Sequence, residues 1–178
     1  FYYDIGKWQI PYDVLWKPDK LSDDERKLVQ DHPVMGYETL KADLNLNEHI
    51  KNAALMHHER YDGSGYPNKL IGDEIDLFAR YIAIIDTYTG MASPRTYREA
   101  FTPLQIAGFF ENNMEKYDVA LLLPILKKIA DAQIGSTVQL NDQSVWEVVL
   151  LNDLKYSRPM LKNSNNQFLD LSANPNLQ

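Results

Sequence analysis

The chain has 178 residues, of which 44% are hydrophobic and 24% are charged, so we expect one globular domain with room for a small second one. Its formal net charge of -7 argues against a nucleic-acid polymer as partner, because a protein that binds such a polymer needs a basic face. The sequence also contains no run of roughly 20 apolar residues, the length that a membrane-spanning helix needs. Cysteine is absent, which excludes disulfides and thiolate metal sites and favours a reducing, cytoplasmic location.

The first half of the chain is predicted to be helical. Gly6 is expected to end the tail of a first helix, and Pro11 and Pro18 bracket an irregular connection. Ser22 and Glu25 have the spacing of a capping box, in which each side chain accepts from a backbone N–H, and this predicts the start of the next helix. The expected helices run over about 23–32, 33–44, 47–56 and 75–91, with either Asn45 or Asn47 as the N-cap of the third. We expect the last of these to be mostly buried.

Two further helix starts follow in the second half. Thr102 and Pro103 provide an N-cap followed by proline at the first helical position, which predicts a helix to about Met114. Asp118 is expected to cap a last helix that continues through Ala130. These helices complete a predicted helical region over residues 1–132.

The pattern changes after residue 135 to short runs of β-forming residues separated by turn residues. The expected strands are 137–140, 145–151, 159–162 and 167–171. Four short strands in about 40 residues cannot form a large independent domain, so we expect a small SH3-like barrel or a curled sheet packed on the helices. The predicted fold is therefore mainly α, with a β subdomain over residues 135–178.

Two adjacent histidines, His57 and His58, stand with Glu59 at the end of an apolar helical run. Imidazole is the commonest neutral metal ligand, and carboxylate is its usual hard partner. Adjacent histidines in a regular helix point about 100° apart, and the glycine-rich turn that follows favours an end to the helix there. The candidate metal ligands are Asp4, His32, His57, His58 and Asp86.

Each candidate also has a simpler structural explanation. Either of the adjacent histidines could be a buried, hydrogen-bonded residue at a helix end. His32 precedes a proline and could mark a helix boundary, and Asp86 could pair with an arginine, because a buried carboxylate needs some partner. Glu59 and Asp62 could orient the ligand histidines or brace the turn.

Several motifs, taken in order, resemble the HD-GYP family. They are Asp4-Ile5-Gly6-Lys7, His32-Pro33, the eleven residues from His57 to Pro67, and Asp86 followed by Arg95, Tyr97 and Arg98. The resemblance covers about residues 1 to 130. It implies an HD-domain-like helical bundle and a metal-dependent phosphodiesterase that hydrolyses cyclic di-GMP, a bacterial second messenger, or a related nucleotide.

The resemblance also implies roles for individual residues. The implied metal ligands are Asp4, His32, His57, His58 and Asp86, with divalent iron or manganese as cofactor. Asp4 and Lys7 match catalytic positions, and Lys7 would lie near the scissile phosphate. Tyr66, Arg95 and Arg98 match positions that contact the substrate. The metal would activate water and, with these positive groups, neutralise the phosphoryl oxygens.

One departure from the family pattern bears on activity. Tyr3 stands where the family has the histidine of its HD pair, and upstream glutamate and histidine ligands are absent from this chain. One metal site is therefore better supported than two, because a second would retain only Asp4 and Asp86. We expect a degenerate member with low or absent phosphodiesterase activity. The alternative is a catalytically inactive module that senses a nucleotide or docks a partner.

The start of the chain is apolar, with Phe1, Tyr2, Ile5 and Trp8 close together. A beginning at Phe1 rather than methionine indicates a fragment whose preceding helices are missing. The remaining residues would then form an exposed apolar patch, and such patches usually find a partner. We expect either a homodimer contact or an upstream segment to cover it.

Overall fold

The structure is a computed structural model that describes residues 2–94 and 99–177. Seven α-helices and four strands are assigned within these residues. The helices are α1 (Tyr12–Leu15), α2 (Asp23–Gln30), α3 (His32–Leu40), α4 (Glu48–Met56), α5 (Leu77–Ala92), α6 (Pro103–Glu111) and α7 (Val119–Asp131). The short 3-10 helices are η1 (Ile5–Gln9), η2 (Gly72–Glu74), η3 (Met114–Lys116) and η4 (Leu171–Ala173). The strands are β1 (Thr137–Gln139), β2 (Val145–Leu150), β3 (Met160–Lys162) and β4 (Phe168–Asp170).

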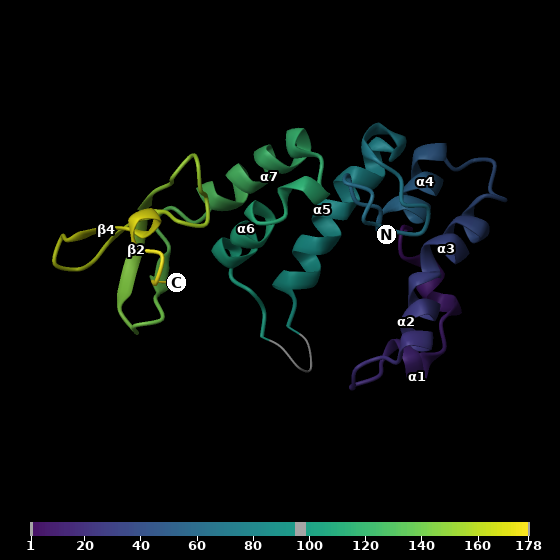
Figure 1. Ribbon diagram of the computed structural model, residues 1–178, viewed down its shortest axis with the longest axis horizontal. Coiled ribbons are helices and arrows are strands. Elements are labelled where there is room, and N and C mark those ends of the chain that lie inside the picture. The colour runs from purple at the N-terminus through teal and green to yellow at the C-terminus, as the bar shows by residue number, and fades with distance from the viewer. Residues whose placement is uncertain (1, 95–98, 178) are drawn as a thin grey trace.

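The elements follow one long axis. Helices α1 to α3 lie at one end, α5 to α7 occupy the middle, and the sheet lies at the other end (Figure 1). Helix α4 packs against both α3 and α5, and η1 packs against α3. No helix in the described part of the chain is both long and apolar enough to cross a membrane. The mainly helical fold with a small β extension is confirmed, whereas the division into domains 1–132 and 135–178 stays a prediction.

The helices begin where their capping residues predict. The Ser22 hydroxyl accepts from the Glu25 backbone N–H, and the Glu25 carboxylate accepts from the Ser22 N–H, which completes the capping box of α2. Thr102 caps α6 in the same way, and Asp118 and Asn47 cap α7 and α4. These side chains satisfy N–H groups that have no partner inside a helix, so local sequence determines the starts.

Some local expectations are wrong. The 3-10 helix η1 continues through Gly6 instead of ending there, and α1 forms in the stretch that was expected to be irregular. Leu44 is 92% exposed because α3 ends at Leu40 and the chain turns outward. Helix α5 is less buried than predicted, since its apolar residues lie on two sides and Leu77 and Ile85 are exposed.

Two separate apolar clusters form the core. The first joins α5, α6 and α7, and its buried members are Ile84, Ile106, Ala107, Phe110, Tyr117, Leu122 and Leu126. The second belongs to the sheet, with Leu140, Val148, Leu161 and Leu171 buried. Leu104 of α6 packs against this second cluster and so joins the sheet to the helices.

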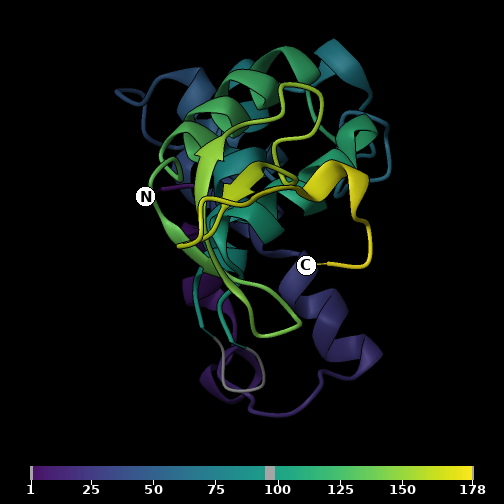
Figure 2. The ribbon, with the colours of Figure 1, turned by 90° about the vertical axis from the view of Figure 1, so that its left-hand side faces the viewer.

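The sheet is an antiparallel meander in the order β1-β2-β3-β4 (Figure 2). The pairing of β2 with β3 is irregular between Val148 and Leu150. The sheet does not close, because β1 and β4, of three residues each, do not pair with each other and remain its two edges. Of the two predicted forms, the SH3-like barrel is therefore wrong.

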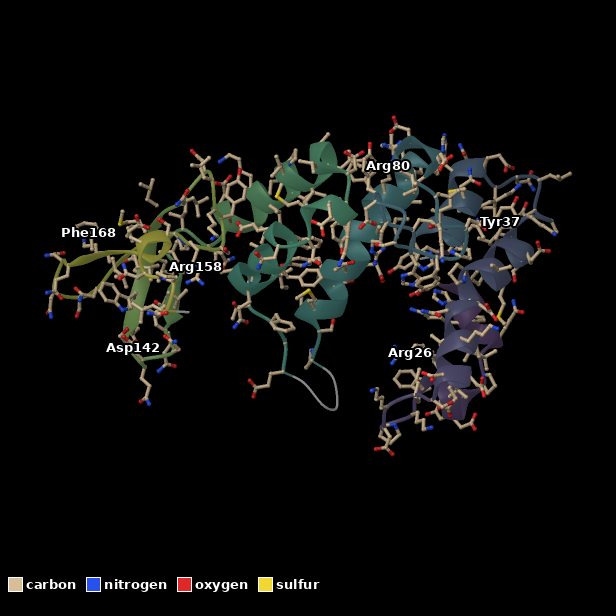
Figure 3. All side chains as sticks on the ribbon, in the orientation of Figure 1. Arg26, Tyr37, Arg80, Asp142, Arg158 and Phe168 are labelled. Carbon is tan, nitrogen blue, oxygen red and sulfur yellow. The ribbon has the colours of Figure 1, made fainter. Side chains whose placement is uncertain are left out.

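Arg80 on α5 connects three segments of the helical part (Figure 3). Its Nε donates to the Ile75 carbonyl at 2.9 Å. Its Nη1 donates to Asp73 Oδ1 at 2.8 Å and to Asp118 Oδ2 at 2.9 Å. Because Asp118 is also the N-cap of α7, this arginine ties the start of α7 to α5, the helix that carries Asp86.

An exposed aromatic surface lies along η1 and α1. Its members are Tyr2, Trp8, Tyr12 and Trp16, of which Trp8 is 90% exposed. The Tyr12 and Trp16 rings lie side by side, with centroids 6.1 Å apart. The expected apolar patch is thus present at Tyr2 and Trp8, while Ile5 is partly buried and Phe1 lies outside the described residues. A partner that covers this surface stays a prediction.

Gly6 allows η1 to lie directly against α3. A methyl group at this position would overlap the His32 carbonyl oxygen and lie 2.6 Å from the Gly36 nitrogen. We expect Gly6→Ala to lower the free energy of unfolding by about 3 kcal/mol, because two backbones must separate. Gly36→Ala is the matched control, since the nearest atom to its added methyl is 3.3 Å away, and it should cost less than about 1 kcal/mol. Equal losses in urea unfolding would contradict this explanation.

Candidate metal centre

Three histidines meet where α3 begins and α4 ends. His32 is the first residue of α3, and His57 and His58 follow Met56, the last residue of α4. One ring nitrogen from each histidine lies within 4.8 Å of those of the other two. Because α4 ends at Met56, the two adjacent rings can turn toward the same point. The fourth histidine, His49, is exposed on α4, as expected for a residue outside the cluster.

Asp4 directs one carboxylate oxygen at two of these histidines. Its Oδ1 lies 3.3 Å from His32 Nε2 and 3.5 Å from His57 Nε2. The two Nε2 atoms are themselves 3.1 Å apart. This Oδ1 is buried and makes no hydrogen bond to any described residue. The other oxygen, Oδ2, accepts from Lys7 Nζ at 2.7 Å.

Backbone carbonyls determine which ring nitrogens can bind a metal. His32 Nδ1 is 2.6 Å from the Val29 carbonyl oxygen, and His57 Nδ1 is 3.0 Å from that of Ala54 and 3.1 Å from that of Ala53. A carbonyl oxygen only accepts, so each Nδ1 carries the hydrogen and each neutral ring presents a lone pair at Nε2. Two nitrogen lone pairs and a carboxylate oxygen thus face one another, which favours a cation between them.

The protonation states also suit ligand roles. Burial opposes the charge on Asp4, but the Lys7 ammonium donates to Oδ2 and favours it, so the pKa of Asp4 lies below its usual range. Burial, with the neighbouring His57 and His32, lowers the pKa of His58 to about 2. At neutral pH the aspartate is therefore charged and His58 is neutral, and these are the forms that bind metals. The three histidines could hold a divalent ion, and Asp4 adds a suitable oxygen.

His58 should make the metal-free protein less stable at mildly acidic pH. Its pKa of about 2 in the folded state is below the ordinary value of 6.5, so the unfolded chain binds the proton first as the pH falls. The contribution of neutral His58 to the free energy of unfolding is therefore complete above pH 6.5, and it is lost progressively as the pH falls below that value. From pH 7.5 to 5.5 we expect a loss of about 1 kcal/mol from this residue. Urea unfolding with a chelator at both pH values should show a smaller loss in His58→Gln, and equal losses would exclude this role.

Asp86 reaches the cluster through Tyr3. The Tyr3 hydroxyl donates to Asp86 Oδ1 at 3.4 Å, and its ring meets the His57 ring edge-on with centroids 5.1 Å apart. Burial, the charges of Asp86 and Asp4, and the hydrogen bond to Asp86 raise the pKa of Tyr3 to about 12. Tyr3 therefore remains a phenol that donates its hydrogen. A ligand role for Asp86 stays a prediction.

The predicted substrate-binding residues are only partly placed by the structure. Lys7 borders the cluster through its ion pair with Asp4. The Tyr66 ring stacks on the His58 ring, with centroids 4.8 Å apart and planes inclined by 21°. Arg95 and Arg98 lie outside the described residues. The roles proposed for all four in substrate binding or catalysis stay predictions.

Two acidic residues of the central motif brace the turn. The buried Glu59 accepts from the Asn68 N–H at 2.6 Å and from the Leu70 N–H at 3.1 Å. Asp62 accepts from the Ser64 N–H at 2.9 Å. Of the two explanations that the sequence left open for these acids, the structure shows turn bracing.

Comparison with known proteins places the chain in a family. The sequence profile of the HD domain matches residues 1–121. The cyclic di-GMP phosphodiesterase response regulator RpfG of Xanthomonas campestris pv. campestris is 47% identical over 103 residues, which cover 56% of this chain and 27% of that protein. A cyclic di-GMP phosphodiesterase of Pseudomonas aeruginosa is 32% identical over 160 residues, covering 90% and 39% of the two chains. The 3'3'-cGAMP-specific phosphodiesterase 1 of Vibrio cholerae is 41% identical over 146 residues, covering 82% and 31%.

The present chain spans well under half the length of these relatives. The match to the HD domain nevertheless extends over more than half of the chain and includes the whole histidine cluster together with Asp4. The helical architecture and the motifs around the cluster agree with it. This chain therefore belongs to the HD domain family, of the HD-GYP type, and is similar in sequence to cyclic di-GMP phosphodiesterases.

Proposed function

We propose that this protein is a metal-dependent phosphodiesterase that acts on cyclic di-GMP or a related cyclic dinucleotide such as 3'3'-cGAMP. The observation that carries the proposal is the convergence of Asp4 Oδ1 with the Nε2 atoms of His32 and His57, at 3.3 and 3.5 Å. Three acceptors that face one another without a hydrogen between them suit a bound cation. The activities named for the relatives supply the substrate class.

We assign the ion to His32, His57, His58 and Asp4, with iron or manganese preferred because mixed imidazole and carboxylate ligands suit both. A bound divalent ion supplies Lewis acidity toward a phosphoryl oxygen and lowers the pKa of a coordinated water. The protein holds these side chains in metal-binding forms. The Val29 and Ala54 carbonyls fix the tautomers of His32 and His57, and burial keeps His58 neutral.

Lys7 and Tyr66 would position the substrate beside the ion. Lys7 Nζ has three donors, of which Asp4 takes one, so the others can contact a phosphate oxygen. Tyr66 supports the His58 ring by stacking, and its proposed further role is to contact a base of the substrate. Arg95 and Arg98 are proposed as further phosphate contacts because a cyclic dinucleotide carries two negative charges.

We further propose that the activity is low. Tyr3 uses its hydroxyl to donate to Asp86, which engages a carboxylate oxygen that would otherwise be free for a second ion. A neutral phenol is a poor ligand for a divalent metal, so Tyr3 itself adds little. One ion per chain is therefore better supported than two.

Metal content and turnover together test this function. We expect about one iron or manganese ion per chain after reconstitution, and slow formation of the linear product from cyclic di-GMP. His57→Gln should lose the ion, whereas His49→Gln removes an exposed histidine outside the cluster and should retain it. Metal content near zero in the unmodified protein would refute the site, and rapid turnover would refute the reduced activity.

A catalytically inactive sensing or docking module is the second candidate. The hydrogen bond from Tyr3 to Asp86 favours it, because this contact occupies a carboxylate that catalysis with two ions would need. Calorimetry with cyclic di-GMP beside the turnover assay separates the two functions. Binding without any linear product would support the module.

The aromatic surface is proposed to be covered by a second copy of the chain or by an upstream segment. Light scattering tests the first version, since a monodisperse monomer would exclude the homodimer. A cytoplasmic setting is also part of the proposal, because a chain without cysteine suits a reducing compartment.

A further inference from the structure

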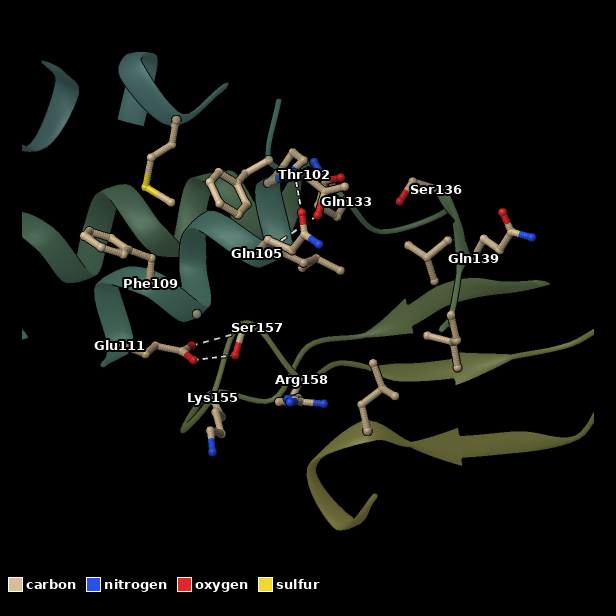
Figure 4. Close-up of a pocket in the computed structure, with 18 of the residues that line it drawn as sticks. Thr102, Gln105, Phe109, Glu111, Gln133, Ser136, Gln139, Lys155, Ser157 and Arg158 are labelled. Atoms are coloured by element: carbon tan, nitrogen blue, oxygen red, sulfur yellow. Dashed lines mark hydrogen bonds between the residues drawn. The ribbon is translucent and has the colours of Figure 1, made fainter. Parts of the chain in front are cut away.

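A cleft of about 940 Å³ lies between α6 and the sheet (Figure 4). Leu104 and Phe109 of α6 line one wall, and Val138 and Leu140 line the other. The turn over residues 155–158 forms the floor. The histidine cluster belongs to the opposite end of the long axis, so the cleft is a separate site (Figure 1). Its volume lies within the range of small-molecule sites.

The floor of the cleft carries two positive charges. The Arg158 N–H donates to the Lys155 carbonyl at 2.9 Å, which closes a turn and holds the two residues near each other. Arg158 donates to the Leu177 carbonyl, and neither cation pairs with a carboxylate among the described residues. The acid of the lining, Glu111, instead accepts from the Ser157 N–H and hydroxyl (Figure 4).

A polar atom in the wall also lacks a partner. Ser136 Oγ is buried and has no hydrogen bond to any described residue, and Ser136 lines the cleft. A buried hydroxyl without a partner costs roughly 1–3 kcal/mol, so a ligand atom at this position would be favourable. Among the described residues, the cleft thus combines apolar walls, one hydroxyl without a hydrogen bond and two cations without a carboxylate partner, in a chain whose net charge is -7.

We propose that this cleft binds an amphipathic organic anion, an apolar body that carries one carboxylate, sulfonate or phosphate group. Lys155 and Arg158 would pair with the anionic group, since charge-assisted hydrogen bonds are the strong ones. The apolar body would lie between Leu104 and Val138. The proposal does not depend on the function assigned to the histidine cluster.

The test uses a charged probe and its uncharged analogue. The probes are 8-anilinonaphthalene-1-sulfonate and N-phenyl-1-naphthylamine, which share an aromatic body and differ in the sulfonate. Fluorescence titration should give saturable binding of the sulfonate. Lys155→Gln combined with Arg158→Gln should weaken that binding about tenfold or more and leave the uncharged analogue within about twofold. Arg26→Gln combined with Lys27→Gln removes the same two charges from exposed positions on α2. This control should change neither the binding of the sulfonate nor that of the uncharged analogue.

Amide shift mapping in the unmodified protein supplies a second measurement, which does not depend on the folding of any variant. Shifts at Gly108 and Ser136 on addition of the sulfonate would support the cleft. Shifts confined to Trp8 and Trp16 would place the probe on the aromatic surface and overturn the proposal. Absence of saturable binding, or equal binding by the double variant with its circular dichroism unchanged, would also overturn it.

Discussion

Replacing Asp4 with asparagine should weaken the binding of a divalent ion by about 100-fold or more and remove measurable turnover. The asparagine keeps the shape of the side chain but loses the negative charge that lies between Lys7 Nζ and two histidine nitrogens. Loss of a residue that merely orients a ligand costs about 10–100-fold in metal affinity, so loss of a charged ligand should reach or exceed the upper value. Metal analysis and calorimetric titration after chelation measure the effect.

Asp13→Asn is the matched control for this change. Asp13 is exposed in the first turn of α1, so its replacement removes the same charge from a position outside the histidine cluster. The control should bind the ion like the unmodified protein. If Asp4→Asn retained full metal content and affinity, the ion would have to be held by the histidines alone, and the proposed ligand set would be wrong.

Tyr3→His should raise the metal content from about one to about two ions per chain and increase turnover about tenfold or more. The Tyr3 side chain lies between the His57 ring and the Asp86 carboxylate. An imidazole at this position would offer a nitrogen lone pair and would release Asp86 from the phenol, so that both could serve a second ion with Asp4. Metal analysis gives the number of ions independently of activity.

Tyr3→Phe separates the two parts of this effect. It removes the hydrogen bond to Asp86 but supplies no ligand, so we expect no second ion and no gain in turnover. A second ion in Tyr3→Phe would show that the freed carboxylate is sufficient. An unchanged metal content in Tyr3→His would show that Tyr3 does not limit the site, and the proposed cause of low activity would fall.

Local sequence accounts for much of the fold. Helix starts at Ser22, Thr102 and Asp118 follow from side chains that satisfy N–H groups within three residues, and this chemistry needs no tertiary information. Burial is different, because it depends on what packs against each face. Leu77 and Leu44 are apolar but exposed, since no described element covers that face of α5 or the chain after α3.

The sequence indicated candidate residues for the site but not their geometry, and their role as ligands stays a prediction. The sequence indicated Asp4, His32 and His57 as ligands, and the structure places their acceptor atoms together. The backbone carbonyls that fix the histidine tautomers leave no signature in residue identity, so no reading of side chains could have found them. The cleft was missed for a related reason, because its walls come from α6 and β1 and its floor from a distant turn.

The tautomer-fixing hydrogen bonds connect each of these two candidate ligands to the final turn of a different helix: His32 contacts Val29 of α2, and His57 contacts Ala54 of α4. A shared ion would therefore act as a reversible cross-link between chain segments that are 25 residues apart. At an ion concentration of 100 times Kd, such a link adds about 2.7 kcal/mol to folded-state stability. The ion would also oppose local openings that separate α2 from α4, whereas the apolar cluster of the sheet contains none of the candidate ligands. Amide exchange around α2 and α4 would then slow as metal is supplied.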